Sequence, residues 1–344
     1  MTTMTVSGAG RRGATLRPLP WGRMAWVIWR QHRVALAGVV ALLGALALWL
    51  GISGLQLHHA YAAATGCRPA SSYACGTMIG DFNNTYGSTS NLISGLLQTV
   101  PALVGAFVGA PMLARELETG TFRYAWTQGF ERWRWALAKL VVLAVVVTAA
   151  TGAFSVLFSW YYQPFFAEGN ASPLSPMVFD LRGVTFAAWT LAAFAIGALA
   201  GMLIRRVVPA IVAALALYTG IAIATAGLLR QHYLAPVVTR TLVSPPASAW
   251  VLAKWWTKDG RFAFSGYPPQ IVQHQDCPPS VFGAGGPSLG QVMHCFAQHG
   301  YVQWVSYHPA SRFWPFQWIE GGWLLALSVL LIAATVWLVR RRVA

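Results

Sequence analysis

The chain has 344 residues, of which 56% are hydrophobic and 10% are charged, and its formal net charge is +15. An average soluble domain has roughly 25% charged residues, so this composition excludes an ordinary soluble protein. The positive charge does not indicate nucleic-acid binding, because the basic residues gather at the ends of apolar runs and not on a polar segment with interleaved aromatic residues. We therefore expect an integral membrane protein that has the lipid bilayer as a partner and binds no nucleic acid.

The N-terminal segment divides into a polar tail and an amphipathic stretch. Residues 1–20 are polar and contain glycine, arginine and proline, so we expect a disordered cytoplasmic tail. On a helix from residue 21 to residue 33, the apolar residues share one face and the basic residues lie roughly opposite. This predicts an interfacial helix at the inner headgroup layer. The residues assigned to it are Trp21, Arg23, Met24, Ile28 and Arg30. The alternative is simple cytosolic flanking sequence before the first span.

Six stretches that lack Asp, Glu, Lys and Arg follow this segment: residues 34–57, 92–114, 140–161, 183–204, 207–229 and 321–339. Each has about the 20 residues that a helix needs to cross a bilayer. Only Arg205 and Arg206 separate the fourth stretch from the fifth, which predicts a tight helical hairpin. We therefore expect an all-α integral membrane protein with six transmembrane helices, in which residues 21–339 form one transmembrane domain.

The distribution of basic residues predicts which side of the membrane each segment faces. With the N-terminus inside, most of the 24 Lys and Arg residues lie in the cytoplasm, as the positive-inside rule requires. The C-terminus, residues 340–344, is then cytoplasmic too. The outer segments are residues 58–91, residues 163–182 and a large extracellular loop, residues 230–320, between the fifth and sixth helices. The protein is expected in the plasma membrane.

The chain has four cysteines, Cys67, Cys75, Cys277 and Cys295, and all of them fall in segments placed outside. In an oxidising compartment an even number of cysteines indicates disulfides, and the pairing of sequence neighbours closes the shortest loops among the three possible pairings. The alternative is a metal site, because His274, His294 and His299 lie near two of these cysteines. Their spacing matches no standard zinc pattern, so we expect no metal.

A charged segment, Ala114 to Arg123, lies at the end of the second span and contains a glycine, Gly120, flanked by two threonines. It resembles the first intracellular loop of ABC-2 type transporter permeases, in which an acidic-Glu-x-Gly-Thr motif is followed by Gly-Lys or Ala-Lys before the third span, here Ala138-Lys139. The residues after Thr121 are closer to an actinobacterial branch of these permeases. The resemblance covers most of the chain, since an interfacial helix, six spans and a large outer segment are the plan that it implies.

The resemblance implies that this loop is a coupling helix, which sits in a groove of a separate ATP-binding subunit. The residues assigned to it are Glu116, Glu118, Thr119, Gly120, Thr121 and Arg123. The alternative is that Glu116 and Glu118 are ordinary solvated charges at a helix end.

The source of energy is expected in a partner chain. No lysine follows a glycine, so the chain has no G-x-x-x-x-G-K-[ST] loop for ATP, and the six charge-free stretches offer no ionisable group for an ion-driven carrier. We therefore expect that the chain is not an enzyme and holds no cofactor, and that ATP and Mg belong to two copies of an ATP-binding subunit. The permease is expected to be a homodimer or a heterodimer.

Three functions fit these observations. The first is the permease subunit of an ABC exporter that moves a drug, antibiotic, lipid or peptide outward. The second is a membrane-embedded enzyme with an active site in the outer loop, and the third is a non-transporting assembly or sensor subunit. The outer loop's candidate catalytic residues are Asp259, His274, Asp276, His294 and His299, but they form no recognised constellation.

Polar residues within the spans could line a transport path between two subunits. They are Gln98, Thr99, Thr148, Thr151, Ser155, Tyr218, Thr219 and Thr225. Such residues more often bond their own helix, so the sequence alone does not define a substrate site.

Overall fold

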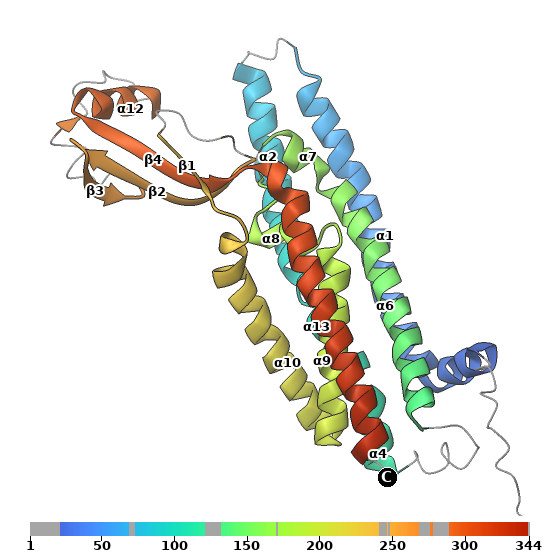
Figure 1. The fold of residues 1–344 in the computed structure, drawn as a ribbon. Helices are drawn as coiled ribbons and strands as arrows, with labels where there is room; N and C mark the ends of the chain where they lie inside the picture. Colours follow the sequence, from blue (N-terminus) through green and yellow to red (C-terminus); the bar gives the residue numbers. More distant parts are fainter. Residues whose placement is uncertain are drawn as a thin grey trace, which may run out of the picture.

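The fold consists of a bundle of long helices with a small sheet beyond one end of it (Figure 1). The computed structural model describes residues 21–68, 73–120, 132–169, 171–240, 246, 248–267, 276–277 and 289–342. The long helices are α1 (Trp21–Thr65), α2 (Tyr73–Leu97), α6 (Arg132–Tyr161), α9 (Thr185–Ile204), α10 (Val207–Ala224) and α13 (Phe313–Arg342). Shorter helices and turns are α3 (Val100–Val104), η1 (Gly105–Gly109), α4 (Ala110–Thr119), α7 (Gln163–Ala167), α8 (Pro176–Phe179), η2 (Thr225–Leu229), η3 (Arg230–His232), α12 (Leu289–Gln298) and η5 (Ala310–Arg312).

Five helical stretches of the described residues are long and apolar enough to cross a membrane. They are Tyr73–Thr119, Trp133–Tyr161, Thr185–Ile204, Val207–His232 and Ala310–Arg341. Five of the six predicted spans fall in these stretches, and the predicted hairpin is present, with Arg205 in a left-handed turn between α9 and α10. The first predicted span, residues 34–57, lies within α1 and is not among the five, so a sixth span stays a prediction.

The first turns of α1 bend away from the bundle and run across its long axis, as the dark blue ribbon in Figure 1 shows. This direction suits the predicted interfacial helix. The side chains of its five assigned residues lie outside the described part of the structure, so their contact with lipid remains a prediction.

The two ends of the bundle differ in chemistry (Figure 1). Gly120 at the end of α4, Arg205 between α9 and α10, and Arg340 near the end of α13 lie at one end, which we call the arginine end. The tips of α1 and α2 and the sheet lie at the other, which we call the disulfide end. The separation matches the sidedness predicted from the basic residues and the cysteines.

Most described residues of the segment 58–91, which was predicted as an outer loop, are helical. Helix α1 continues to Thr65 and α2 begins at Tyr73, and a disulfide between Cys67 and Cys75 closes the short connection. Aromatic residues hold the pair together, since Phe82 of α2 lies 5.7 Å from Tyr61 of α1 and 5.6 Å from Phe165 of α7, between ring centroids. The helices therefore extend well past the predicted span ends.

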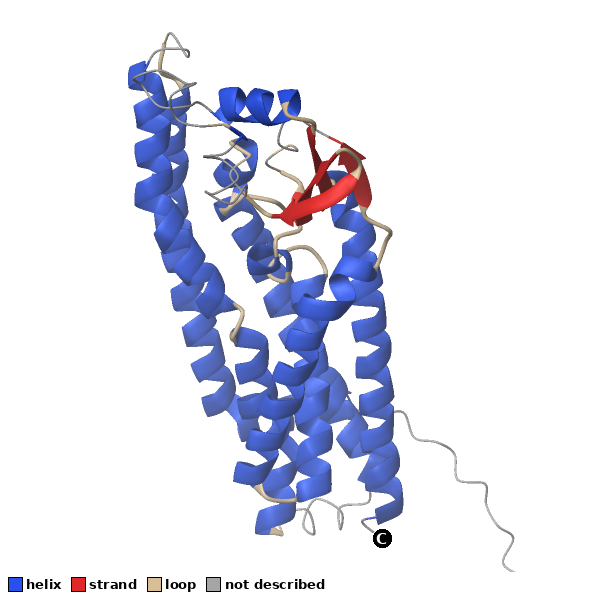
Figure 2. Cartoon of the chain, turned by 90° about the vertical axis from the view of Figure 1, so that its left-hand side faces the viewer, coloured by secondary structure: helices blue, strands red, loops and turns tan. Residues whose placement is uncertain are grey.

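The segment predicted as a large loop, residues 230–320, contains a four-stranded antiparallel sheet that the sequence analysis did not anticipate. Its strands are β1 (Val237–Arg240), β2 (Trp250–Lys258), β3 (Arg261–Ser265) and β4 (Tyr301–His308), in the order β1-β4-β2-β3. Figure 2 shows the sheet and α12 together beside the upper part of the bundle. Trp256, Phe296 and Tyr301 form the core between the sheet and α12, next to the disulfide of Cys277 and Cys295. The membrane part keeps the predicted all-helical architecture.

Helix α9 lies at the centre of the bundle, and most of its residues are buried. It reaches this position because small residues let its backbone touch the stretch from α3 to α4. A β-carbon added to Gly197 would lie 2.1 Å from the carbonyl oxygen of Gly105, and one added to Gly201 would lie 2.3 Å from that of Ala110. Gly197 and Gly201 are therefore required here, because any larger residue would clash with backbone atoms of the neighbouring helix.

Replacing Gly197 by alanine should destabilise the protein, because backbone atoms cannot move aside as a flexible side chain can. We expect Gly197→Ala to lower the free energy of unfolding by about 1–3 kcal/mol, the usual cost of overpacking. Unfolding in micelles by SDS titration measures it. Gly220→Ala on α10 is the matched control, since nothing lies within 4 Å of its added β-carbon. Equal stability of the two variants would contradict the packing described here.

Candidate functional site

The end of α4 carries the predicted coupling motif and is fixed to helix α6 by a buried ion pair. Gly120 ends α4 with a φ of 69°, a conformation that glycine adopts without strain. One turn earlier, Glu116 Oε1 accepts a hydrogen bond of 2.7 Å from Lys139 Nζ. Lys139 has no exposed surface and lies 5.0 Å from the ring centroid of Trp135. The Ala-Lys pair of the predicted motif thus contacts its first glutamate directly.

The second glutamate of the motif is fixed to helix α10. Glu118 Oε2 accepts a hydrogen bond of 3.0 Å from the backbone nitrogen of Val207, the first residue of α10. A carboxylate at this place satisfies a free amide and interacts favourably with the helix dipole. Both glutamates therefore bond to a neighbouring helix. Glu116 is partly buried in its ion pair, whereas Glu118 is exposed, so for Glu118 the alternative of a solvated charge at a helix end stays open.

The remaining coupling residues are placed only in part. Thr119 is exposed and donates its hydroxyl to the carbonyl of Arg115, one turn back in α4. Thr121 and Arg123 lie outside the described residues. The arrangement joins the last turn of α4 to two other helices, so that displacement of Gly120 would act on α6 and α10 together.

A buried charge cluster lies on the side of the sheet, near the start of α9 and just after the end of α10. Arg230 of η3 donates from Nε to Glu320 Oε2 at 2.9 Å, from Nη2 to Glu320 Oε1 at 2.7 Å, and from Nη2 to Asp180. Glu320 also accepts bonds from Trp189 Nε1 at 2.9 Å and from the Tyr233 hydroxyl at 3.1 Å. We call Arg230, Asp180 and Glu320 the Arg230 cluster.

The Arg230 cluster corrects the prediction of membrane helices without ionisable residues. Arg230 and Glu320 have no exposed surface, and both lie inside the apolar helical stretches, as Glu116 and Lys139 do. The wide π-helical turn η2 immediately precedes Arg230. Arg230 also lies over the ring of Phe179, at 4.4 Å from its centroid. An argument against ion-driven transport can therefore no longer rest on an absence of charge.

A comparison with protein families gives one match, to the model described as "ABC-2 membrane transporter related", over residues 40–230. The chain belongs to this family. Comparisons with curated proteins and with solved structures give no match. The matched region runs from α1 to Arg230, so it includes the α4 end with both of its ties.

Membership of the ABC-2-related family supports a permease of an ABC system, which in general works with an ATP-binding partner. The sheet and α12 lie beyond the matched residues.

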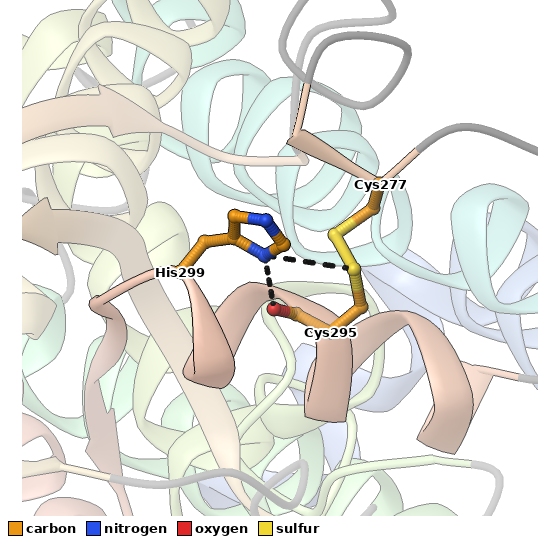
Figure 3. Close-up of side chains that lie close together, drawn as sticks. All are labelled: Cys277, Cys295 and His299. Atoms are coloured by element: carbon orange, nitrogen blue, oxygen red, sulfur yellow. Dashed lines mark hydrogen bonds between the residues drawn. A yellow bond between two sulfur atoms is a disulfide. The ribbon is translucent and has the colours of Figure 1, made fainter. Parts of the chain in front are cut away.

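In this ABC-2-related chain, all four cysteines are paired with their sequence neighbours, Cys67 with Cys75 and Cys277 with Cys295. Among the described residues, His299 lies beside the Cys277–Cys295 disulfide (Figure 3): its Nδ1 is 3.8 Å from Cys295 Sγ and 3.0 Å from the Cys295 carbonyl oxygen. The sulfur atoms of Cys277 and Cys295 both belong to the disulfide, so these cysteines and His299 together offer a metal no thiolate ligand. The local pairing favoured by the sequence is the one present.

The other residues of the alternative active site are dispersed or bonded for structural reasons. Asp276 accepts hydrogen bonds from the Tyr301 hydroxyl at 2.7 Å and from Lys258 Nζ at 3.3 Å, and the first of these bonds lowers the pKa of Asp276 most. Asp259 is in the tight β2–β3 turn, with a φ of 52°. His294 is on α12, and His274 lies outside the described residues. The described residues bring no nucleophile and base together in the sheet.

Removing one partner of the Glu116–Lys139 ion pair should destabilise the protein more than removing both partners. Glu116→Gln leaves Lys139 charged and buried, so we expect a loss of about 3–5 kcal/mol of unfolding free energy. Adding Lys139→Met removes that charge and should recover most of the loss. SDS titration of the purified variants measures both, with Asp81→Asn on the exposed face of α2 as the control. A double variant as unstable as Glu116→Gln would contradict a direct pair.

Proposed function

We propose that this chain is the membrane subunit of an ATP-driven exporter and that energy enters through the α4 end. In this proposal two permease chains form the transmembrane part, as a homodimer or heterodimer in the plasma membrane. Two copies of a separate ATP-binding subunit contact the arginine end, and both termini of each permease are cytoplasmic. The chain itself hydrolyses no ATP and holds no cofactor.

The double attachment of the α4 end is the observation that carries this proposal. A partner that presses on Gly120 would act on a short helix tied to α6 by Glu116 and to α10 by Glu118. The backbone of α9 lies against that of α4 without room for a methyl group at Gly201. Because packed interiors transmit strain and do not compress, a push at one point would displace several helices as a unit.

Exported cargo would then move between the two ends of the bundle without chemical change to the chain. Drug, antibiotic, lipid and peptide remain the candidate cargo classes from family resemblance. The enzyme alternative has no geometric support among the described residues of the sheet, and the family argues for a permease over an assembly or sensor subunit.

A cysteine at the α4 end should crosslink to the ATP-binding subunit. Thr119→Cys is the best position, because Thr119 is exposed whereas Glu118 is needed to cap α10. All native cysteines are in disulfides, so the new thiol is the only reactive one. After co-expression with a candidate ATP-binding subunit, a bifunctional thiol-to-amine reagent should join the two chains.

Arg261→Cys in the sheet is the matched control, because Arg261 is also exposed but belongs to the disulfide end. It should give no crosslink to the ATP-binding subunit. A correctly assembled complex in which Thr119→Cys fails to crosslink, or in which Arg261→Cys crosslinks equally, would contradict the proposed contact.

A further inference from the structure

A cavity of about 430 Å³ opens beside the Arg230 cluster, between α2, α3, α8, α9 and α10. Its polar lining residues include Gln98, Thr99, Asp180, Tyr218 and Thr219. The volume is in the range of small-molecule pockets, about 300–1,000 Å³. Four of the eight polar residues considered for a transport path thus line one cavity. By contrast, Thr151 and Ser155 bond to backbone carbonyls, of Val147 and Gly183.

The charges of the Arg230 cluster do not balance. It holds two carboxylates and one guanidinium, so it carries one surplus negative charge when all three are ionised. Glu320 is fully buried, and its two oxygens accept bonds from Arg230, Trp189 and Tyr233. The side chain of Asp180 keeps 23% of its surface exposed and lines the cavity. The surplus charge is therefore available to the cavity through Asp180.

Burial makes that charge costly. It raises the pKa of Asp180, while the charge of Arg230 opposes this effect and that of Glu320 adds to it. A carboxylate in a partly desolvated site is stabilised by an opposite charge within a few ångströms. A cation in the cavity would supply the positive charge that the cluster lacks.

The remaining walls suit the apolar body of such a cation. Phe186, Trp189 and Tyr218 line the cavity, and the rings of Trp189 and Tyr218 meet edge to face at 5.6 Å. Aromatic faces attract organic cations, most strongly where water is excluded. No lysine or arginine is among the described residues that line the cavity.

One wall is held in place by hydrogen bonds. The side-chain amide nitrogen of Gln98 donates to the carbonyls of Pro176 and Met177, at 2.8 and 3.0 Å. These bonds join the end of α2 to α8, so the cavity is a built feature of the fold.

We propose that this cavity binds an organic monocation, with its charged group against Asp180 and its apolar body against the aromatic walls. This proposal names a substrate class for the proposed exporter. It rests on the proposed function in one respect, which is that the bound cation would be the cargo. Binding itself needs no ATP-binding subunit, so its failure and that of the coupling proposal are separately observable.

The test measures equilibrium binding of radiolabelled tetraphenylphosphonium to the full chain in lipid nanodiscs. Saturable binding is expected, and neutral triphenylphosphine oxide should compete poorly. Asp180→Asn should weaken binding roughly tenfold or more, because the carboxylate whose charge attracts the cation is lost. This variant still leaves Arg230 paired with Glu320, so the cluster becomes neutral and the fold is retained.

A second variant blocks the cavity without changing charge. Thr219→Trp on the exposed side of α10 should also weaken binding, whereas Val212→Trp, exposed on the same helix but outside the cavity, should not. Asp276→Asn in the sheet is the charge control and should bind normally. The proposal is overturned if saturable binding is absent, if it survives either Asp180→Asn or Thr219→Trp, or if the neutral compound competes equally well.

Discussion

Burial of charged side chains inside an apolar bundle is the constraint on which the rest of this structure depends. A lysine or an arginine without exposed surface persists only with a partner, because an unpaired charge in such surroundings is far too costly. Lys139 meets this requirement with Glu116, and Arg230 meets it with Glu320 and Asp180. The first set joins α4 to α6, whereas the second joins segments up to 90 residues apart, and each lies at one end of the bundle.

In the two proposals made above, one set of charges lies where energy enters and the other lies beside a binding cavity. At the arginine end, the charges lock a short helix to its neighbours, and the glycine contacts with α9 make the assembly stiff. At the other end, two carboxylates share one guanidinium, and one of them, Asp180, lines a cavity. Between them runs α9, which is buried along most of its length and contacts α4, α6, α10 and α13. A movement at one end could therefore reach the other through a single packed helix.

Sequence reasoning located the helices well and their ends poorly. Charge-free runs predicted the cores of α6, α9, α10 and α13, because apolar side chains are what a bilayer selects. The same criterion placed Arg230 and Glu320 in a loop, since each borders a charge-free run by one residue. It also assigned residues 58–91 to an outer segment, although α2 begins at Tyr73 within it. Which carboxylate meets which base depends on the packing of distant helices, so no local pattern reveals it.

The sheet was missed although one local signal for it was present. Asp259 and Gly260 both have positive φ values and form a two-residue hairpin turn between β2 and β3, which is what Asp-Gly between strand-forming residues predicts. The many prolines and glycines nearby obscured it. The disulfide pairing, by contrast, followed from short sequence separations, 8 and 18 residues.

The most direct test of the central claim, that energy enters through the α4 end, is ATP hydrolysis by the reconstituted complex of this chain with its ATP-binding subunit. The chain alone should hydrolyse no ATP. The complex should hydrolyse ATP at a different rate from the isolated ATP-binding subunit, and this difference is the control that the permease exerts. Glu118→Ala removes the hydrogen bond from α4 to the first residue of α10 but leaves the buried alanine contacts between these helices, so this variant should assemble normally but lose most of that control. Hydrolysis by the chain alone, or unchanged control in assembled Glu118→Ala complexes, would contradict the account.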